Sequence, residues 1–398
     1  MNSMFHKWFW MVWIGLACVA CGQVKVTKSA GDKVGVDLSG IQVSGGAAIA
    51  VRNTLVNNLN RSGWMEVAPP GKGGVKVRGS ITEANGMLSF TCIATDASGH
   101  TLLNGTYSHP VPRAVYLAHQ VADDLVIKST GKPTFFQAKL AMIGVRSGAK
   151  ELYVADSSVQ DVRQITHDRS IAIKPRWSPD NRYISYTSFR QRYPDVYTIE
   201  WATGIRTRVA AYPGVNSGGA ISPDGRSMAL ILSKDGNPDL YVQDMPSKRL
   251  TRLTHTPRAV EGSPAWSPDG SRIVYVSDAS GTPQLYLIPR TGGTPTRLTT
   301  SGSQNVAPDW GKNGLIAYQT LIGGHFQIAV IDPSTRESRI ISPLDAAYED
   351  PSWAPDERHL AAARSVNYKY SVYLLDSMGD KPVALTTSGD WLAPAWTR

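Results

Sequence analysis

The chain has 398 residues and a mass of 43.1 kDa, a length that fits two or three globular domains better than one. Hydrophobic residues make up 42% and charged residues 18%, which excludes intrinsically disordered and fibrous proteins. The 36 Gly and 25 Pro residues indicate many turns, and 11 Trp and 16 Tyr favour β-strands over helix bundles. A formal charge of +9 raises the question of nucleic-acid or membrane binding.

The first residues have the pattern of an export signal. Residues 8–19 (WFWMVWIGLACV) form an apolar run of twelve, which suits a signal-peptide core and is short of the ~20 residues that span a bilayer. Small residues at 20–22 allow cleavage after Gly22. Alternatively, Cys18 to Cys21 form a lipoprotein box with Cys21 acylated, but Cys18 stands where such a box prefers Leu. We expect a signal peptide over 1–22 and favour soluble export over lipidation of Cys21.

The positive charge is spread along the chain. Without residues 1–22 the net charge is +8, with +4 in residues 23–134 and +4 in the remainder. No run of Lys or Arg is dense enough to follow a phosphate backbone, so we expect no nucleic-acid partner. Cys92 is then the one cysteine outside the signal, and the alternating run around it predicts a buried strand thiol.

One phrase recurs from residue 170 onward. It reads Trp-Ser-Pro-Asp-Gly in its fullest form, and the marker Trp is replaced by Ile221 in the second copy. The marker positions are Trp177, Ile221, Trp266, Trp310, Trp353 and Trp396, which lie 43 to 45 residues apart. A period of this length with strand patterning is typical of a four-stranded propeller blade, in which we expect the Trp to pack between blades.

The two ends of the repeat region predict how the ring closes. The last copy has an inner strand with nothing after it, whereas residues 139–166 supply strands two to four of a blade that lacks its first strand. Pairing these segments leaves no free sheet edge in the ring. The sequence therefore predicts a mainly β protein with a six-bladed β-propeller over 135–398, closed by shared N- and C-terminal strands.

The preceding residues, 23–134, predict a small α/β domain. Apolar residues at helical spacing indicate a helix over 47–60 and a second from Pro112 to about Ser129. Between them, residues 74–107 predict three strands, the first two joined by the turn dipeptide Asn85-Gly86. The order β–α–β–β–β–α favours a mixed sheet with both helices on one face.

Motifs for catalysis, metal binding and cofactor binding were not found. The sequence has no G-x-S-x-G nucleophile elbow and no Gly-rich phosphate loop before a helix, and its eight His residues are scattered. The Asp residues of the repeated turns are explained by turn chemistry. We therefore expect a protein that is not an enzyme and holds no cofactor or metal.

The repeated Trp-Ser-Pro-Asp-Gly phrases, the closing Pro394-Ala-Trp396 and the segment 116–124 (YLAHQVADD) resemble the TolB family, exported propeller proteins of the Tol–Pal system of Gram-negative bacteria. The resemblance covers essentially the whole mature chain. It implies a periplasmic, non-catalytic and monomeric adaptor, peripheral to the outer membrane, that supports membrane integrity and constriction at cell division. The implied partners are the peptidoglycan-associated lipoprotein Pal at the propeller and TolA at the N-terminal segment, where residues 23–38 match only loosely.

Blade geometry predicts where a partner binds. The loops that lead into the inner strands open near the central channel, on the face opposite the Ser-Pro-Asp-Gly turns. They supply Lys174, Asn216, Glu261, Gln304, Asn305, Glu349 and Asp350. A ring of mixed charge suits protein recognition better than an apolar ligand pocket. Two other hypotheses remain open: a propeller related to prolyl-oligopeptidase-type peptidases, and a propeller that binds peptidoglycan or another glycan.

Overall fold

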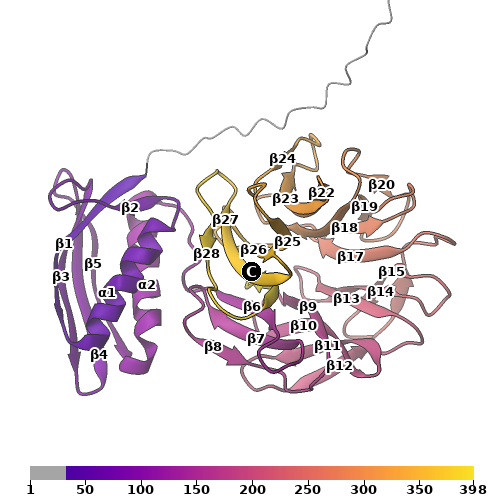
Figure 1. Cartoon of the computed structure of the whole chain (residues 1–398), viewed down its shortest axis with the longest axis horizontal. Helices are drawn as coiled ribbons and strands as arrows, with labels where there is room; N and C mark the ends of the chain where they lie inside the picture. Colours follow the sequence, from indigo (N-terminus) through magenta and orange to yellow (C-terminus); the bar gives the residue numbers. More distant parts are fainter. Residues whose placement is uncertain (1–32) are drawn as a thin grey trace, which may run out of the picture.

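The structure is a computed structural model and describes residues 33–398, in which a small α/β domain lies beside a six-bladed β-propeller (Figure 1). This confirms the predicted fold class. The expected signal peptide, its cleavage after Gly22 and the acylation of Cys21 concern residues outside this range. Within it, no helix combines the length and the apolar character needed to cross a membrane.

The α/β domain is a five-stranded sheet with two helices on one face. Its elements are β1 (Val34–Ser44), α1 (Gly46–Asn60), β2 (Met65–Val67), β3 (Val75–Ala84), β4 (Met87–Asp96), β5 (Thr101–Pro110), the 3₁₀ helix η1 (Val111–Arg113) and α2 (Ala114–Thr130). The strand order is β2-β1-β3-β4-β5, with β1 parallel to both its neighbours and the other pairs antiparallel. The sheet is therefore mixed, as predicted, and the helices lie between it and the propeller (Figure 1).

Local sequence explains the element boundaries. Asn85 and Gly86 have φ values of 52° and 74°, the left-handed pair that a tight hairpin turn requires between β3 and β4. The second helix begins at Ala114 rather than Pro112, because the residues around this proline form the 3₁₀ turn. Cys92 is 2% exposed in β4, so the predicted buried thiol is confirmed.

The propeller consists of six four-stranded blades. Blade one consists of β9 (Ala172–Trp177), β10 (Tyr183–Gln191), β11 (Tyr193–Glu200) and β12 (Arg206–Ala210), and blade two of β13 (Asn216–Ile221), β14 (Ser227–Leu232), β15 (Asp239–Asp244) and β16 (Leu250–Arg252). Blade three consists of β17 (Glu261–Trp266), β18 (Arg272–Ser277), β19 (Gln284–Pro289) and β20 (Thr296–Arg297), and blade four of β21 (Asn305–Trp310), β22 (Ile316–Ile322), β23 (His325–Ile331) and β24 (Ser338–Ile340). Blade five consists of β25 (Ala347–Trp353), β26 (His359–Val366), β27 (Lys369–Asp376) and β28 (Val383–Ala384), and blade six of β29 (Trp391–Trp396), β6 (Lys139–Gly144), β7 (Glu151–Asp156) and β8 (Val162–Gln164).

Blade six joins the two ends of the propeller sequence. Strand β29 pairs antiparallel with β6, with Trp396 opposite Leu140. Just beyond this pair, the Lys139 amide donates a hydrogen bond to Thr397 Oγ1 at 3.0 Å. The predicted closure by shared strands is confirmed, and it gives every blade four paired strands.

The repeated phrase has the roles expected of it. The five marker Trp side chains are at most 7% exposed and pack in the apolar layers of the blades. In the turn of blade three, Ser267 Oγ donates to Asp269 at 2.6 Å and Gly270 adopts φ 68°. Glu357 occupies the equivalent position in blade five with φ 63°, and its carbonyl accepts a hydrogen bond from the Asn313 side chain at 2.7 Å.

The α/β domain rests on the turn side of blades five and six. Its buried His119 places Nε2 2.9 Å from a carboxylate oxygen of Asp156, and burial lowers the pKa of the imidazole. The guanidinium of Arg358 lies 4.3 Å from the ring centre of Trp64 and donates to Asp376 at 2.7 Å. These buried contacts hold the domain against blades five and six, beside which it lies in Figure 1.

Candidate protein-binding site at the propeller channel

The wall of the central channel is built from six β-bulges. The inner strand of every blade shifts register against its neighbour at the same point. At the equivalent position of each bulge a residue adopts a positive φ, and in blade two Gly219 does so as well. The six equivalent residues are Lys174, Gly218, Ser263, Ala307, Asp350 and Ala393, with φ between 45° and 93°. Left-handed backbone at non-glycine residues is costly and tends to persist where it positions functional groups. The ring lines a cavity of about 60 Å³.

Two members of this ring carry opposite charges. Lys174 Nζ donates to Ser263 Oγ at 3.2 Å, from blade one to blade three. Burial by the channel walls lowers the pKa of Lys174 and raises that of Asp350, while the attraction between the two charges opposes both shifts. Since the walls displace bulk water, charges here are screened less than on an open surface, so a partner that enters the channel meets both signs of charge.

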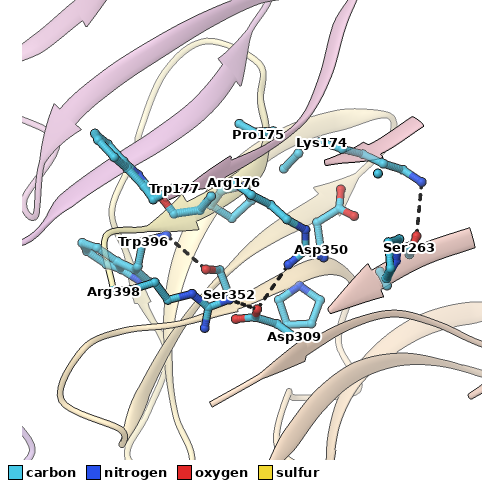
Figure 2. Close-up of a pocket in the computed structure, with 17 residues that line it drawn as sticks. Lys174, Pro175, Arg176, Trp177, Ser263, Asp309, Asp350, Ser352, Trp396 and Arg398 are labelled. Atoms are coloured by element: carbon cyan, nitrogen blue, oxygen red, sulfur yellow. Dashed lines mark hydrogen bonds and ion pairs between the residues drawn. The ribbon is translucent and has the colours of Figure 1, made fainter. Parts of the chain in front are cut away.

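A second charged cluster lies one layer deeper (Figure 2). Arg176 Nη1 donates to Asp309 Oδ1 at 3.4 Å, and the guanidinium of Arg398 contacts the same oxygen. The other oxygen of Asp309 accepts the Trp353 amide at 2.8 Å. One carboxylate therefore joins four blades across the channel and faces two guanidinium groups. Sequence reasoning missed this cluster, because the residue before each marker position follows no periodic pattern.

The structure separates the seven predicted site residues into two groups. Four of them reach solvent at the channel face, namely Lys174, Gln304, Glu349 and Asp350. Glu349 and Asp350 are neighbours, and burial, followed by repulsion from Asp350, raises the pKa of Glu349. These four side chains form the accessible part of the candidate site.

The other three residues correct the sequence-based expectation. Asn216 and Asn305 are fully buried and Glu261 is 2% exposed. The Asn216 amide donates to the Tyr212 carbonyl at 2.8 Å, and that of Asn305 donates to the side chain of Gln284 at 2.7 Å. Each is the first residue of an inner strand, where it holds the loop that precedes or neighbours it. Their side chains are thus buried within the protein rather than exposed at the channel face.

Glu261 has an unusual environment among these three. Its carboxylate accepts hydrogen bonds from Thr256 at 2.9 Å and Ser277 at 3.2 Å, both neutral hydroxyls. Burial raises its pKa to about 7, the two hydroxyls oppose the shift, and the charge of Asp239 adds to it. Because no cation pairs with it among the described residues, this carboxyl is a structural group that titrates near neutral pH.

A family model and the curated relatives indicate one family. A family model described as the TolB beta propeller domain matches residues 126–398. The protein TolB homolog of Chlorobaculum tepidum is 31% identical over 208 residues, which cover 52% of this chain and 47% of that protein. The Tol-Pal system protein TolB of Francisella tularensis is 38% identical over 148 residues, covering 35% and 34%. The matches thus span half or less of these relatives.

The whole fold also has a solved counterpart. The crystal structure of TolB from Acinetobacter baumannii superimposes with a TM-score of 0.80 at 23% identity, covering 92% of this chain and 97% of that one. At this identity the likeness concerns the fold, and it includes the α/β domain as well as the propeller. Because the family model matches the complete ring of blades, the chain belongs to the TolB β-propeller family.

Proposed function

We propose that the protein is a non-catalytic periplasmic adaptor of a Tol–Pal envelope complex. The face of the propeller opposite the α/β domain binds a Pal-type peptidoglycan-associated lipoprotein. Through this contact the adaptor supports outer-membrane integrity and constriction at cell division. Membership of the TolB β-propeller family supports a role in such a complex, and relatives that carry the name Tol-Pal system protein TolB support the same system.

The observation that carries the proposal is the charged channel mouth. Lys174 and Asp350 present opposite charges on strained backbone, and Glu349 adds a second acid beside them. Charges of both signs around a recess favour a specific protein surface with complementary charges. The contact with TolA remains a prediction, because most of the segment 23–38 lies outside the described residues.

Binding to the soluble domain of the cognate Pal-type lipoprotein tests the proposal. We expect Glu349→Lys to weaken binding about tenfold, because it replaces an interfacial charge by its opposite. Glu337→Lys makes the same change at an exposed turn between β23 and β24, away from the channel, and should leave affinity unchanged. Isothermal titration calorimetry measures both variants against the unmodified protein.

Two outcomes would overturn the proposal. The first is the absence of binding to the lipoprotein domain at micromolar concentrations. The second is retention on purified peptidoglycan without any protein partner, which would favour the glycan-binding hypothesis. If the Glu349→Lys and Glu337→Lys variants bind the lipoprotein domain with equal affinity, the lipoprotein is still the partner, but the channel mouth is not where it binds.

A further inference from the structure

The opposite end of the channel contains an apolar pocket of about 280 Å³. It opens among the Ser-Pro-Asp-Gly turns of blades one to three, on the side where the α/β domain packs against blades five and six. Its apolar lining consists of Trp177, Pro179, Ala220, Ile221, Pro223, Ala265, Trp266, Pro268 and Trp310. Its volume is close to the roughly 300 Å³ at which pockets for small ligands begin.

The pocket coincides with the one marker position of the repeat that does not hold a Trp. Blade two carries Ile221 where the other five blades carry Trp. Ile221 is partly exposed, whereas the Trp side chains on either side of it, Trp177 and Trp266, are 5% and 7% exposed. A smaller side chain at a position that elsewhere holds an indole leaves space between two indole rings. The departure from the repeat thus creates the pocket.

The three Trp side chains of the lining are 4–7% exposed, so they present only narrow apolar edges to the pocket. Their indole N–H groups donate to backbone carbonyls of the protein, namely Trp177 to Ala395 at 3.0 Å, Trp266 to Ala220 at 2.9 Å and Trp310 to Gly314 at 3.1 Å. A ligand is therefore held through ring contacts rather than through hydrogen bonds to these residues. Aromatic groups are the natural occupants, since aromatic pairs gain contact energy beyond their buried area.

The charged residues of the lining all have the same sign. They are Arg176, Lys312 and Arg398, and the described residues that line the pocket include no Asp or Glu. Against these three cations stand Asp309, which faces both guanidinium groups behind the wall, and Glu357, which lines a neighbouring recess together with Lys312 and Arg398. Lys312 is exposed at the rim. The pocket therefore has an excess of positive charge beside an aromatic floor, which suits an anion.

We propose that this pocket binds an aromatic carboxylate, with the ring in the space beside Ile221 and the carboxylate toward Lys312 and Arg398. An aromatic ring with a carboxylate is found both in free aromatic acids and in a peptide whose C-terminal residue is aromatic. The proposal concerns the turn side of the propeller and does not depend on the partner proposed for the other face.

Calorimetry and saturation-transfer NMR with N-acetyltryptophan, N-acetyltryptophanamide and a tetrapeptide ending in Trp test the proposal. We expect the carboxylate to bind at least about fivefold more tightly than the neutral amide, because a cation at a wet rim contributes about 1 kcal/mol, or a factor of about five. A tetrapeptide that binds more tightly than N-acetyltryptophan identifies a peptide C-terminus as the ligand, and equal affinities identify the free molecule.

Two variants make the test specific. Ile221→Trp restores the repeated residue and should abolish binding by filling the space, whereas Ile205→Trp adds an indole at a site that is 66% exposed and should not. Lys312→Gln, a surface change, should weaken carboxylate binding about fivefold, and Lys128→Gln on α2 is its control. The proposal is overturned if the carboxylate does not bind at millimolar concentration, or if Ile221→Trp binds it as the unmodified protein does.

Discussion

Removal of the Asp309 carboxylate should destabilise the propeller from its centre. In an Asp309→Ala variant the Trp353 amide, now bonded at 2.8 Å, is left buried without an acceptor. Loss of a hydrogen bond to a charged group costs about 1–3 kcal/mol. Arg176 and Arg398 are also left facing each other without a counter-charge. Their side chains are 24% and 28% exposed, so we add only about 1 kcal/mol for this repulsion after allowing for solvent.

The free energy of unfolding of the Asp309→Ala variant should therefore be lower by about 2–4 kcal/mol, which for a domain of this size corresponds to a fall in Tm of about 4–8 °C. Differential scanning calorimetry measures it. Asp309→Asn keeps an acceptor for the amide and should recover about half of the loss. Asp345→Ala breaks an ion pair with Arg364 of 2.9 Å at a side chain that is 55% exposed, and it should cost less than about 1 kcal/mol. Equal destabilisation by Asp309→Ala and Asp345→Ala would refute the role of Asp309 as a link between blades.

Three further predictions concern other parts of the molecule. Burial raises the pKa of Glu261 to about 7, so folding opposes ionisation of this carboxyl. The free energy of unfolding therefore falls as the pH rises from about 4.5 to 7. We expect Glu261→Gln to raise Tm relative to the unmodified protein by about 2 °C or more at pH 8 but not at pH 4. A scan that shows the same difference at both pH values would contradict this. Gly79→Ala should unfold the α/β domain, because the added Cβ would lie 1.9 Å from the carbonyl oxygen of Thr91. Its control, Gly99→Ala, has open space around the added Cβ and should lower the free energy of unfolding by only about 1 kcal/mol. Circular dichroism measures the unfolding of both variants. Burial raises the pKa of Cys92 to about 11, so its reaction with a disulfide reagent should proceed only as fast as the domain opens, and rapid labelling in the native state would count against this.

The sequence predicts the ring well because its signals are local and repeated. A marker Trp before a Ser-Pro-Asp-Gly turn is both a packing residue and a chain reversal, so each copy specifies one hairpin of one blade. The spacing of copies gives the blade count. Closure follows because β29 has no partner strand in its own repeat and β6 lacks one.

The site is predicted less well because it depends on contacts without sequence periodicity. Arg176 and Asp309 lie 133 residues apart and come together only through the geometry of the ring. Asn216 and Glu261 have the polarity of exposed loop residues, but hydrogen bonds to neighbouring loops retain them in the interior. Polarity alone does not distinguish a recognition residue from a buried loop anchor, since both occur at the start of an inner strand.

The closure of blade six also bears on how fast the molecule can fold. Lys139 and Thr397 are hydrogen-bonded across a sequence separation of 258 residues, so the ring is among the slow topologies in which a long chain segment must be ordered before its ends meet. Until β29 pairs, the edge of β6 is available to any other strand. A variant that weakens the pairing of β29 with β6 should therefore aggregate more readily when it refolds from denaturant.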